Sequence, residues 1–142
     1  MAFILAVLLS LSASSPKPAI NTQFDNLALR GYDAVAYFTE GQAIRGMAQF
    51  ETTWNGAKWR FASADHRDRF VNGPDKFAPQ FGGYCAWAVA HGYTADGDPE
   101  AWKIVDDRLY LNYSKRVQRK WKANIPEFIR RGRANWPAVL AE

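Results

Sequence analysis

The chain has 142 residues, of which 48% are hydrophobic, 23% charged and 15% aromatic. This balance is typical of one folded domain with its own core, and it excludes disordered, collagen-like and low-complexity chains. A single cysteine excludes an intramolecular disulfide and any multi-cysteine zinc or iron–sulfur centre, and a net charge of +4 is too small to indicate a nucleic-acid binder by itself.

The first segment of the chain predicts export. Positions 3–11 are apolar except for Ser10, and small residues follow, as in the apolar core and cleavage region of a secretory signal. The run is too short to span a bilayer; a buried N-terminal strand and an uncleaved anchor are the alternatives, because no Lys or Arg precedes it. We therefore expect a signal peptide at 1–15, an extended lead-in at 16–30, a folded domain at 31–142, and a periplasmic or secreted mature protein.

Two β-hairpins are predicted from alternating polar and apolar residues around short polar turns. The first covers residues 47–61 and turns at Asn55-Gly56, a pair that accepts the positive φ angles of a type I′ turn. The second joins strands at 102–105 and 109–113.

Helices are predicted where capping residues precede helical spacing of apolar residues. Ser63 is placed to cap a helix that Gly73-Pro74 ends, and Ser114 is placed to cap another. A final helix opens at 124–127, where Asn-Ile-Pro-Glu resembles a capping box with proline in the first turn. This order of elements predicts an α+β fold, with a small antiparallel sheet of two hairpins packed with several short helices.

Several segments together resemble the YHS-domain group, small domains named for a Tyr-His-Ser signature. The group is labelled metal-binding after relatives that carry paired cysteines and are fused to copper-transporting ATPases and hydroxylases. Where those relatives have the two cysteines this chain has Ala62 and His66, and the signature histidine is absent. The resemblance implies the fold, with the C-terminal helices as an extension, while the relatives' metal ligands are not preserved. It extends over about 21–140 and rests on Gly31–Phe38, Trp59–Ser63, Ala78–Ala86 and Leu109–Tyr113.

Cys85 is the central candidate for function, because an exported protein with one thiol buries it, couples it to a partner or uses it. A short helix is expected at 84–91, which would place Cys85 in the first turn, where the helix dipole favours the reactive thiolate. The alternative is a small buried hydrophobic side chain. A copper or zinc ion would need further ligands, for which His66 and His91 are the candidates, unless both are structural or surface imidazoles. On a helix Cys85 and His91 point about 120° apart, whereas on a strand they share one face.

A metal-free alternative rests on aromatic residues. Tyr32, Tyr84 and Trp87 predict an aromatic cleft that binds a small molecule or a protein segment, with Cys85 in a structural role. Asp33 either belongs to this cleft as a buried acceptor or holds backbone N–H groups at a turn or helix cap. A third interpretation, a thiol redox accessory protein, requires an exposed Cys85 with a lowered pKa.

Positive charge is concentrated near the C-terminus. Between Lys115 and Arg133 the sequence has eight basic residues and a single acid, Glu127. Such a run is most simply the solvated face of two helices, and otherwise it fits an acidic partner protein or an anionic membrane surface. Nucleic acid is not expected as a partner, because no aromatic and basic strand signature accompanies the run.

Enzymatic activity has no positive support in the sequence. It contains no nucleophile–base pair, phosphate-binding glycine loop or dinucleotide motif. We therefore expect a small exported binding protein that handles a soft metal ion at Cys85 or binds a small molecule without metal.

Overall fold

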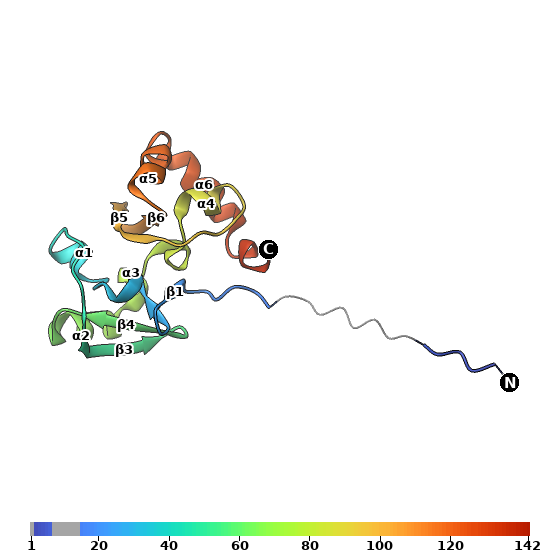
Figure 1. Ribbon diagram of the computed structural model, residues 1–142. Coiled ribbons are helices and arrows are strands. Elements are labelled where there is room, and N and C mark those ends of the chain that lie inside the picture. The colour runs from blue at the N-terminus through green and yellow to red at the C-terminus, as the bar shows by residue number, and fades with distance from the viewer. Residues whose placement is uncertain (1, 7–14) are drawn as a thin grey trace.

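A computed structural model describes residues 2–6 and 15–142, and in these residues it contains six α-helices and two small β-sheets (Figure 1). The expected α+β class is thus confirmed. In chain order the elements are β1 (Thr22–Gln23), β2 (Leu27–Ala28), a 3-10 turn (Leu29–Gly31), α1 (Ala36–Thr39), β3 (Met47–Trp54), β4 (Ala57–Phe61), α2 (Ala64–Asn72), α3 (Pro74–Phe77), a 3-10 turn (Gln80–Gly83), α4 (Ala86–Ala90), β5 (Asp98–Val105), β6 (Arg108–Asn112), α5 (Lys115–Lys122), α6 (Ile125–Asn135) and a last 3-10 turn (Ala138–Ala141).

The larger sheet is mixed and has the strand order β1-β2-β4-β3. Its hairpin turns at Asn55-Gly56, whose φ angles of 49° and 79° are those of the predicted turn. Ala57, Trp59 and Phe61 in β4 are each at most 1% exposed, whereas β3 lies at the sheet edge and is half-buried or exposed along its length. The hairpin is confirmed, and β4 supplies most of its core side chains because it is paired on both sides.

The smaller sheet is the predicted second hairpin, formed by β5 and β6. Its turn residues Asp106 and Asp107 have positive φ angles, which short acidic side chains accept more easily than bulky ones. Ser114 follows directly and caps α5, because its Oγ accepts the Val117 N–H at 3.1 Å. The hairpin turn and the start of α5 are therefore each determined by residues at that place in the chain.

One expected detail of the helices, the capping box at the start of the last helix, is wrong. Asn124 makes no side-chain cap hydrogen bond at the start of α6, so the capping box is not formed. Its acid, Glu127, pairs with Arg130 and Arg131 one turn ahead. The competing arginines explain why this carboxylate does not turn back to the helix end.

Two hydrophobic clusters form the core. One is built on the larger sheet and α2 and contains Trp59 and Phe70, and the other lies among α4, β6, α5 and α6 and contains Trp121 and Ile129. Figure 1 shows α1 to α3 with β1, β3 and β4 in the lower half and α4 to α6 with β5 and β6 in the upper half. The β5–β6 hairpin joins the two halves, because Leu109 and Leu111 of β6 belong to the first cluster. Functional pockets are therefore expected at the rims of either cluster or between them.

The lead-in is docked and not free. The Lys17 N–H donates to the Leu140 carbonyl, and the Asn21 N–H donates to the Gly82 carbonyl, both at 2.8 Å. The predicted signal peptide falls largely on residues 7–14, which lie outside the described residues. In the part of the chain that is described, no helix is long and apolar enough to cross a membrane.

Candidate functional site

Asp33 is a buried carboxylate that organises the turn before α1. Its Oδ1 accepts the N–H groups of Val35 and Ala36 at 2.9 and 3.1 Å, and its Oδ2 accepts the N–H of Ala62 at 2.9 Å. The same Oδ2 lies 2.6 Å from Nδ1 of His66. Of the two alternatives for Asp33, the structure therefore shows the turn acceptor that holds backbone N–H groups.

His66 links two helices. Nε2 of its ring lies 3.3 Å from Oγ1 of Thr39 and 3.7 Å from a carboxylate oxygen of Glu40, both at the end of α1. Its Nδ1 faces Asp33, and its side chain is 12% exposed. Both ring nitrogens are thus occupied by protein groups, so this imidazole joins α1 to α2 and offers no free nitrogen to Cys85.

Cys85 is 1% exposed and is the N-cap of α4. Its Sγ lies 3.5 Å from Oδ1 of Asn112, which also accepts the Trp87 N–H at 3.0 Å. Burial raises the pKa of the thiol and outweighs the backbone N–H groups of Ala88, Tyr113 and Trp87, which act in the opposite direction. Of the two alternatives for Cys85, the structure therefore shows the buried side chain, because desolvation dominates over the helix terminus. This environment is the opposite of the exposed, low-pKa thiol that a redox role requires.

His91 closes α4 and has its own partners. Its Nδ1 lies 2.7 Å from the Trp87 carbonyl oxygen, so this nitrogen carries the proton. Its ring centroid lies 4.0 Å from that of Trp87 and 5.5 Å from that of Phe128. Because the segment is helical, the strand geometry in which Cys85 and His91 share one face is not formed.

The groups around Cys85 do not fit a soft-metal centre. Among residues 2–6 and 15–142, no group of three or more His, Cys, Asp or Glu side chains is placed to hold a metal ion. The side-chain atom facing the thiol is the Asn112 amide oxygen, a ligand type suited to hard cations more than to copper or zinc. Cys85, His66 and His91 are therefore held by three separate sets of partners.

The aromatic cleft expected from Tyr32, Tyr84 and Trp87 does not form as one site. The Tyr32 hydroxyl lies 3.4 Å from Glu100, and Tyr84 is 5% exposed with its hydroxyl donating to the Pro18 carbonyl at 2.8 Å. Burial raises the pKa of Tyr84. Of the four residues assigned to ligand binding, Trp87 alone lines the pocket next to Cys85.

A pocket of about 240 Å³ opens next to Cys85. Its floor is buried, since Cys85 and Ala88 are 1% exposed, and its mouth reaches solvent through the rings of Tyr93 and Tyr113, which are 49% and 57% exposed. Three of the lining side chains are purely aliphatic, and the four that carry a polar group are Cys85, Trp87, Tyr93 and Tyr113. Most of the lining residues could not be identified from the sequence. They come from α4, the loop after it, the end of β6 and α5, and no regular sequence spacing relates these segments. The lining residues are Cys85, Trp87, Ala88, Tyr93, Ala95, Tyr113 and Val117.

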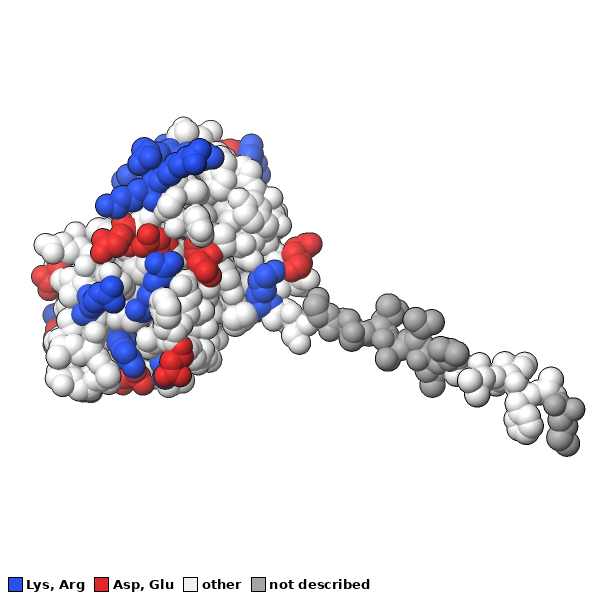
Figure 2. All heavy atoms as spheres, in the orientation of Figure 1, with Lys and Arg blue, Asp and Glu red and all other residues white. Residues whose placement is uncertain are grey.

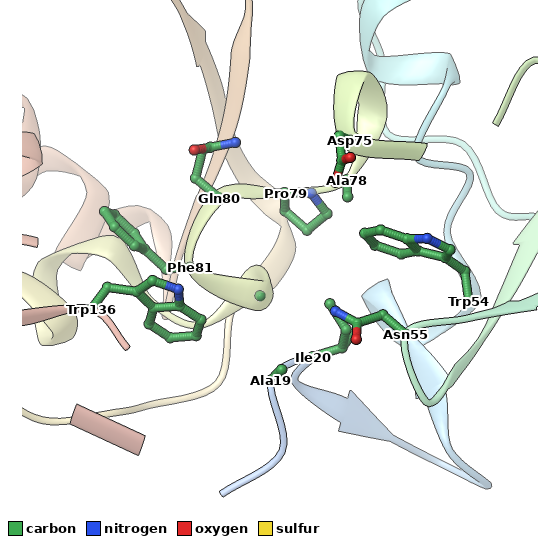
Figure 3. A pocket seen from close by; sticks show the side chains of 11 residues that line it. Ala19, Ile20, Trp54, Asn55, Asp75, Ala78, Pro79, Gln80, Phe81 and Trp136 are labelled. Carbon is green, nitrogen blue, oxygen red and sulfur yellow. The ribbon is translucent and has the colours of Figure 1, made fainter. Parts of the chain in front are cut away.

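Figure 3 shows a second hollow, of about 220 Å³, between Trp54 on one side and Trp136 on the other. Pro79 and the 3-10 turn after it lie between the two indoles, and Ala19 and Ile20 of the lead-in form another wall. This hollow is therefore the seam along which the lead-in meets both halves of the molecule.

Comparison of the chain with protein-family models, with curated proteins and with solved structures finds no match in any of the three. The geometry of the Cys85 pocket is thus the strongest basis for a functional assignment.

Proposed function

We propose that this protein binds a small molecule without metal, in the pocket next to Cys85. The observation that carries the proposal is the pocket's construction, with a buried apolar floor and a mouth of solvent-facing tyrosines. Small-molecule sites are typically concave and mostly apolar, with few polar groups that fix orientation. The lining residues that carry polar groups are Cys85, Trp87, Tyr93 and Tyr113.

The volume of the pocket limits the ligand. At about 240 Å³ it lies just below the ~300–1,000 Å³ common for drug-sized ligands. It has room for roughly eight water-sized groups, since water takes ~30 Å³ in the liquid. A substituted benzene ring or a short alkyl chain fits this space.

Cys85 acts in this proposal as a wall and not as a reactive group. Its thiol shares the Asn112 amide oxygen with the Trp87 N–H, so the contact fixes the start of α4. A serine in its place retains the hydrogen bond and nearly the same volume. We therefore expect Cys85→Ser to bind the same ligands.

The test uses p-cresol, a neutral aromatic probe of suitable size, and follows the methyl signals of Ala88, Ala95 and Val117 by NMR. Saturable shifts confined to these methyls support the proposal. Val117→Phe, which places a ring in the pocket, should abolish them, whereas Val71→Phe should not, because Val71 lies on α2 and is already 56% exposed.

Three results would overturn the proposal. The first is the absence of saturable shifts with p-cresol and with a short alcohol such as 1-hexanol. The second is unchanged binding by a folded Val117→Phe protein. The third is retention of about one copper or zinc ion per chain that Cys85→Ser abolishes, which would restore the metal-handling interpretation.

A further inference from the structure

We infer that the pocket next to Cys85 accepts a small anionic amphiphile, such as an aromatic or short-chain carboxylate, whose acid group is bound by the basic side chains of α5. The inference rests on the proposed function and deepens it by naming the ligand class. It comes from the wall that α5 contributes to the pocket through Val117.

Helix α5 is strongly basic. Five of its eight residues are Lys or Arg, and it contains no acid. Figure 2 shows basic side chains gathered in a band over this end of the molecule, where Figure 1 places α5. Such a band produces a positive potential over the neighbouring surface and attracts anions. The five residues are Lys115, Arg116, Arg119, Lys120 and Lys122.

These five cations make no ion pair within the described parts of the chain, in contrast to Arg130 and Arg131 of α6. Glu127, the single acid of the region, is bound by Arg130 at 2.6 Å and by Arg131 at 2.9 Å. This pairing lowers the pKa of Glu127 to about 2, so the carboxylate stays charged and bound to the two arginines. Helix α5 therefore keeps its charge available for an external anion.

Lys120 connects this charge to the pocket. Its Nζ lies 5.9 Å from the ring centroid of Trp87, which lines the pocket. Val117, another lining residue, is three positions earlier on α5, so the two side chains lie on one face of the helix. The apolar wall and the Lys120 ammonium group are thus adjacent. A ligand that contacts both has an apolar body joined directly to an anionic group.

A small ligand explains the pocket and the charge together. An anionic membrane or an acidic protein would use the band on α5, but neither requires the buried floor formed by Cys85 and Ala88. The pocket is also too small for a whole acyl chain or a protein segment. We therefore assign the site to a small carboxylate.

The experiment compares phenylacetate with phenylacetamide, which have the same size and shape but differ in charge, by titration calorimetry on the wild-type chain. The acid should bind about fivefold more tightly than the amide, as expected for a solvent-accessible charge pair. Lys120→Gln should remove this preference. Lys76→Gln is the matched control, because Lys76 lies over the ring of Phe77 at 5.5 Å but on α3, in the other half. High salt should reduce the preference as well.

The outcomes separate the two proposals. Equal affinity for acid and amide, or a preference that persists in Lys120→Gln, overturns the anionic ligand class and leaves small-molecule binding intact. Failure of both compounds to bind counts against the proposed function itself. Binding to phosphatidylglycerol vesicles, lost in Lys120→Gln, without binding of phenylacetate would assign α5 to a membrane surface and overturn the inference.

Discussion

Oδ2 of Asp33 lies 2.6 Å from Nδ1 of His66, although the two residues are 33 positions apart in the chain. The carboxylate is fully buried, and it also accepts backbone N–H groups on both sides of the contact. It thereby joins the turn before α1 to the end of β4 and the first turn of α2. The Asp33–His66 pair stabilises the half of the fold that contains α1, α2 and β4, and neither residue lines the pocket next to Cys85.

Replacing Asp33 with Ala should lower the free energy of unfolding by about 3–5 kcal/mol, because it leaves buried N–H groups and His66 without their acceptor. His66→Ala keeps the hydrogen bonds that the backbone N–H groups donate to Asp33 and should cost about 1–2 kcal/mol. Urea unfolding of both variants measures the difference. Equal losses in the two would contradict the assignment of Asp33 mainly to the backbone.

Cys85 should react slowly in the native protein. With 1% exposure and a pKa raised by burial, it should be alkylated by iodoacetamide at pH 7.5 only when the structure opens. We expect labelling at least about a hundredfold slower than in urea, which corresponds to local opening of low population. Mass spectrometry over time gives the rate. Rapid native labelling below neutral pH would support the redox interpretation.

The same burial predicts a loss of stability at alkaline pH. Because the folded pKa of Cys85 is raised, the folded state holds this proton more tightly than the unfolded chain. The corresponding stability is complete below the unfolded pKa of about 8.5 and is lost as pH rises through the folded pKa. Tyr37 and Tyr84 also have pKa values raised by burial and should extend the loss above about pH 10.

Urea unfolding from pH 7 to 11 tests this dependence. Cys85→Ser lacks the thiol, so its stability should fall less than that of the wild type as pH rises above about 8.5. The loss that comes from the tyrosines above about pH 10 is common to both proteins. Identical slopes throughout would show that the thiol pKa is the same in the folded and unfolded chains.

Local structure was predictable from the sequence wherever neighbouring residues determine it. The Asn55-Gly56 turn and the Ser63 and Ser114 caps are set within a few positions, and all three form as expected. The capping box at Asn124 failed, although its pattern is just as local. Charge pairing one turn away competed with it, which spacing alone does not reveal.

The candidate site was much less predictable. Cys85 and Trp87 were identified because a single cysteine and a nearby indole stand out in composition, but Tyr93 and Val117 reach the same pocket from a loop and from α5. These residues come together only because the helices pack on the β5–β6 hairpin, and such packing produces no periodic pattern in the sequence. The sequence also left two alternatives open for Cys85, a reactive thiolate and a buried side chain, because burial depends on these distant segments.

Gly82 tests the docking of the lead-in at the seam in Figure 3. Its φ angle is +62°, and a Cβ added there would collide with the carbonyl oxygen of Ala19. Gly82→Ala should therefore displace the lead-in, weaken the Asn21 N–H bond to the Gly82 carbonyl and cost about 3 kcal/mol or more. Gly73→Ala is the control, because Gly73 has open space around it and an extended φ of −163°.

Hydrogen exchange at the Asn21 N–H distinguishes local displacement from general destabilisation. In the wild type this amide should be protected by its 2.8 Å bond to the Gly82 carbonyl. In Gly82→Ala the Asn21 amide should exchange as fast as an unprotected, solvent-exposed amide. The amides of β4 should exchange faster only by the factor that the lowered free energy of global unfolding predicts. Protection of Asn21 that survives the substitution would mean that the lead-in stays docked despite a Cβ at position 82, which would contradict the prediction.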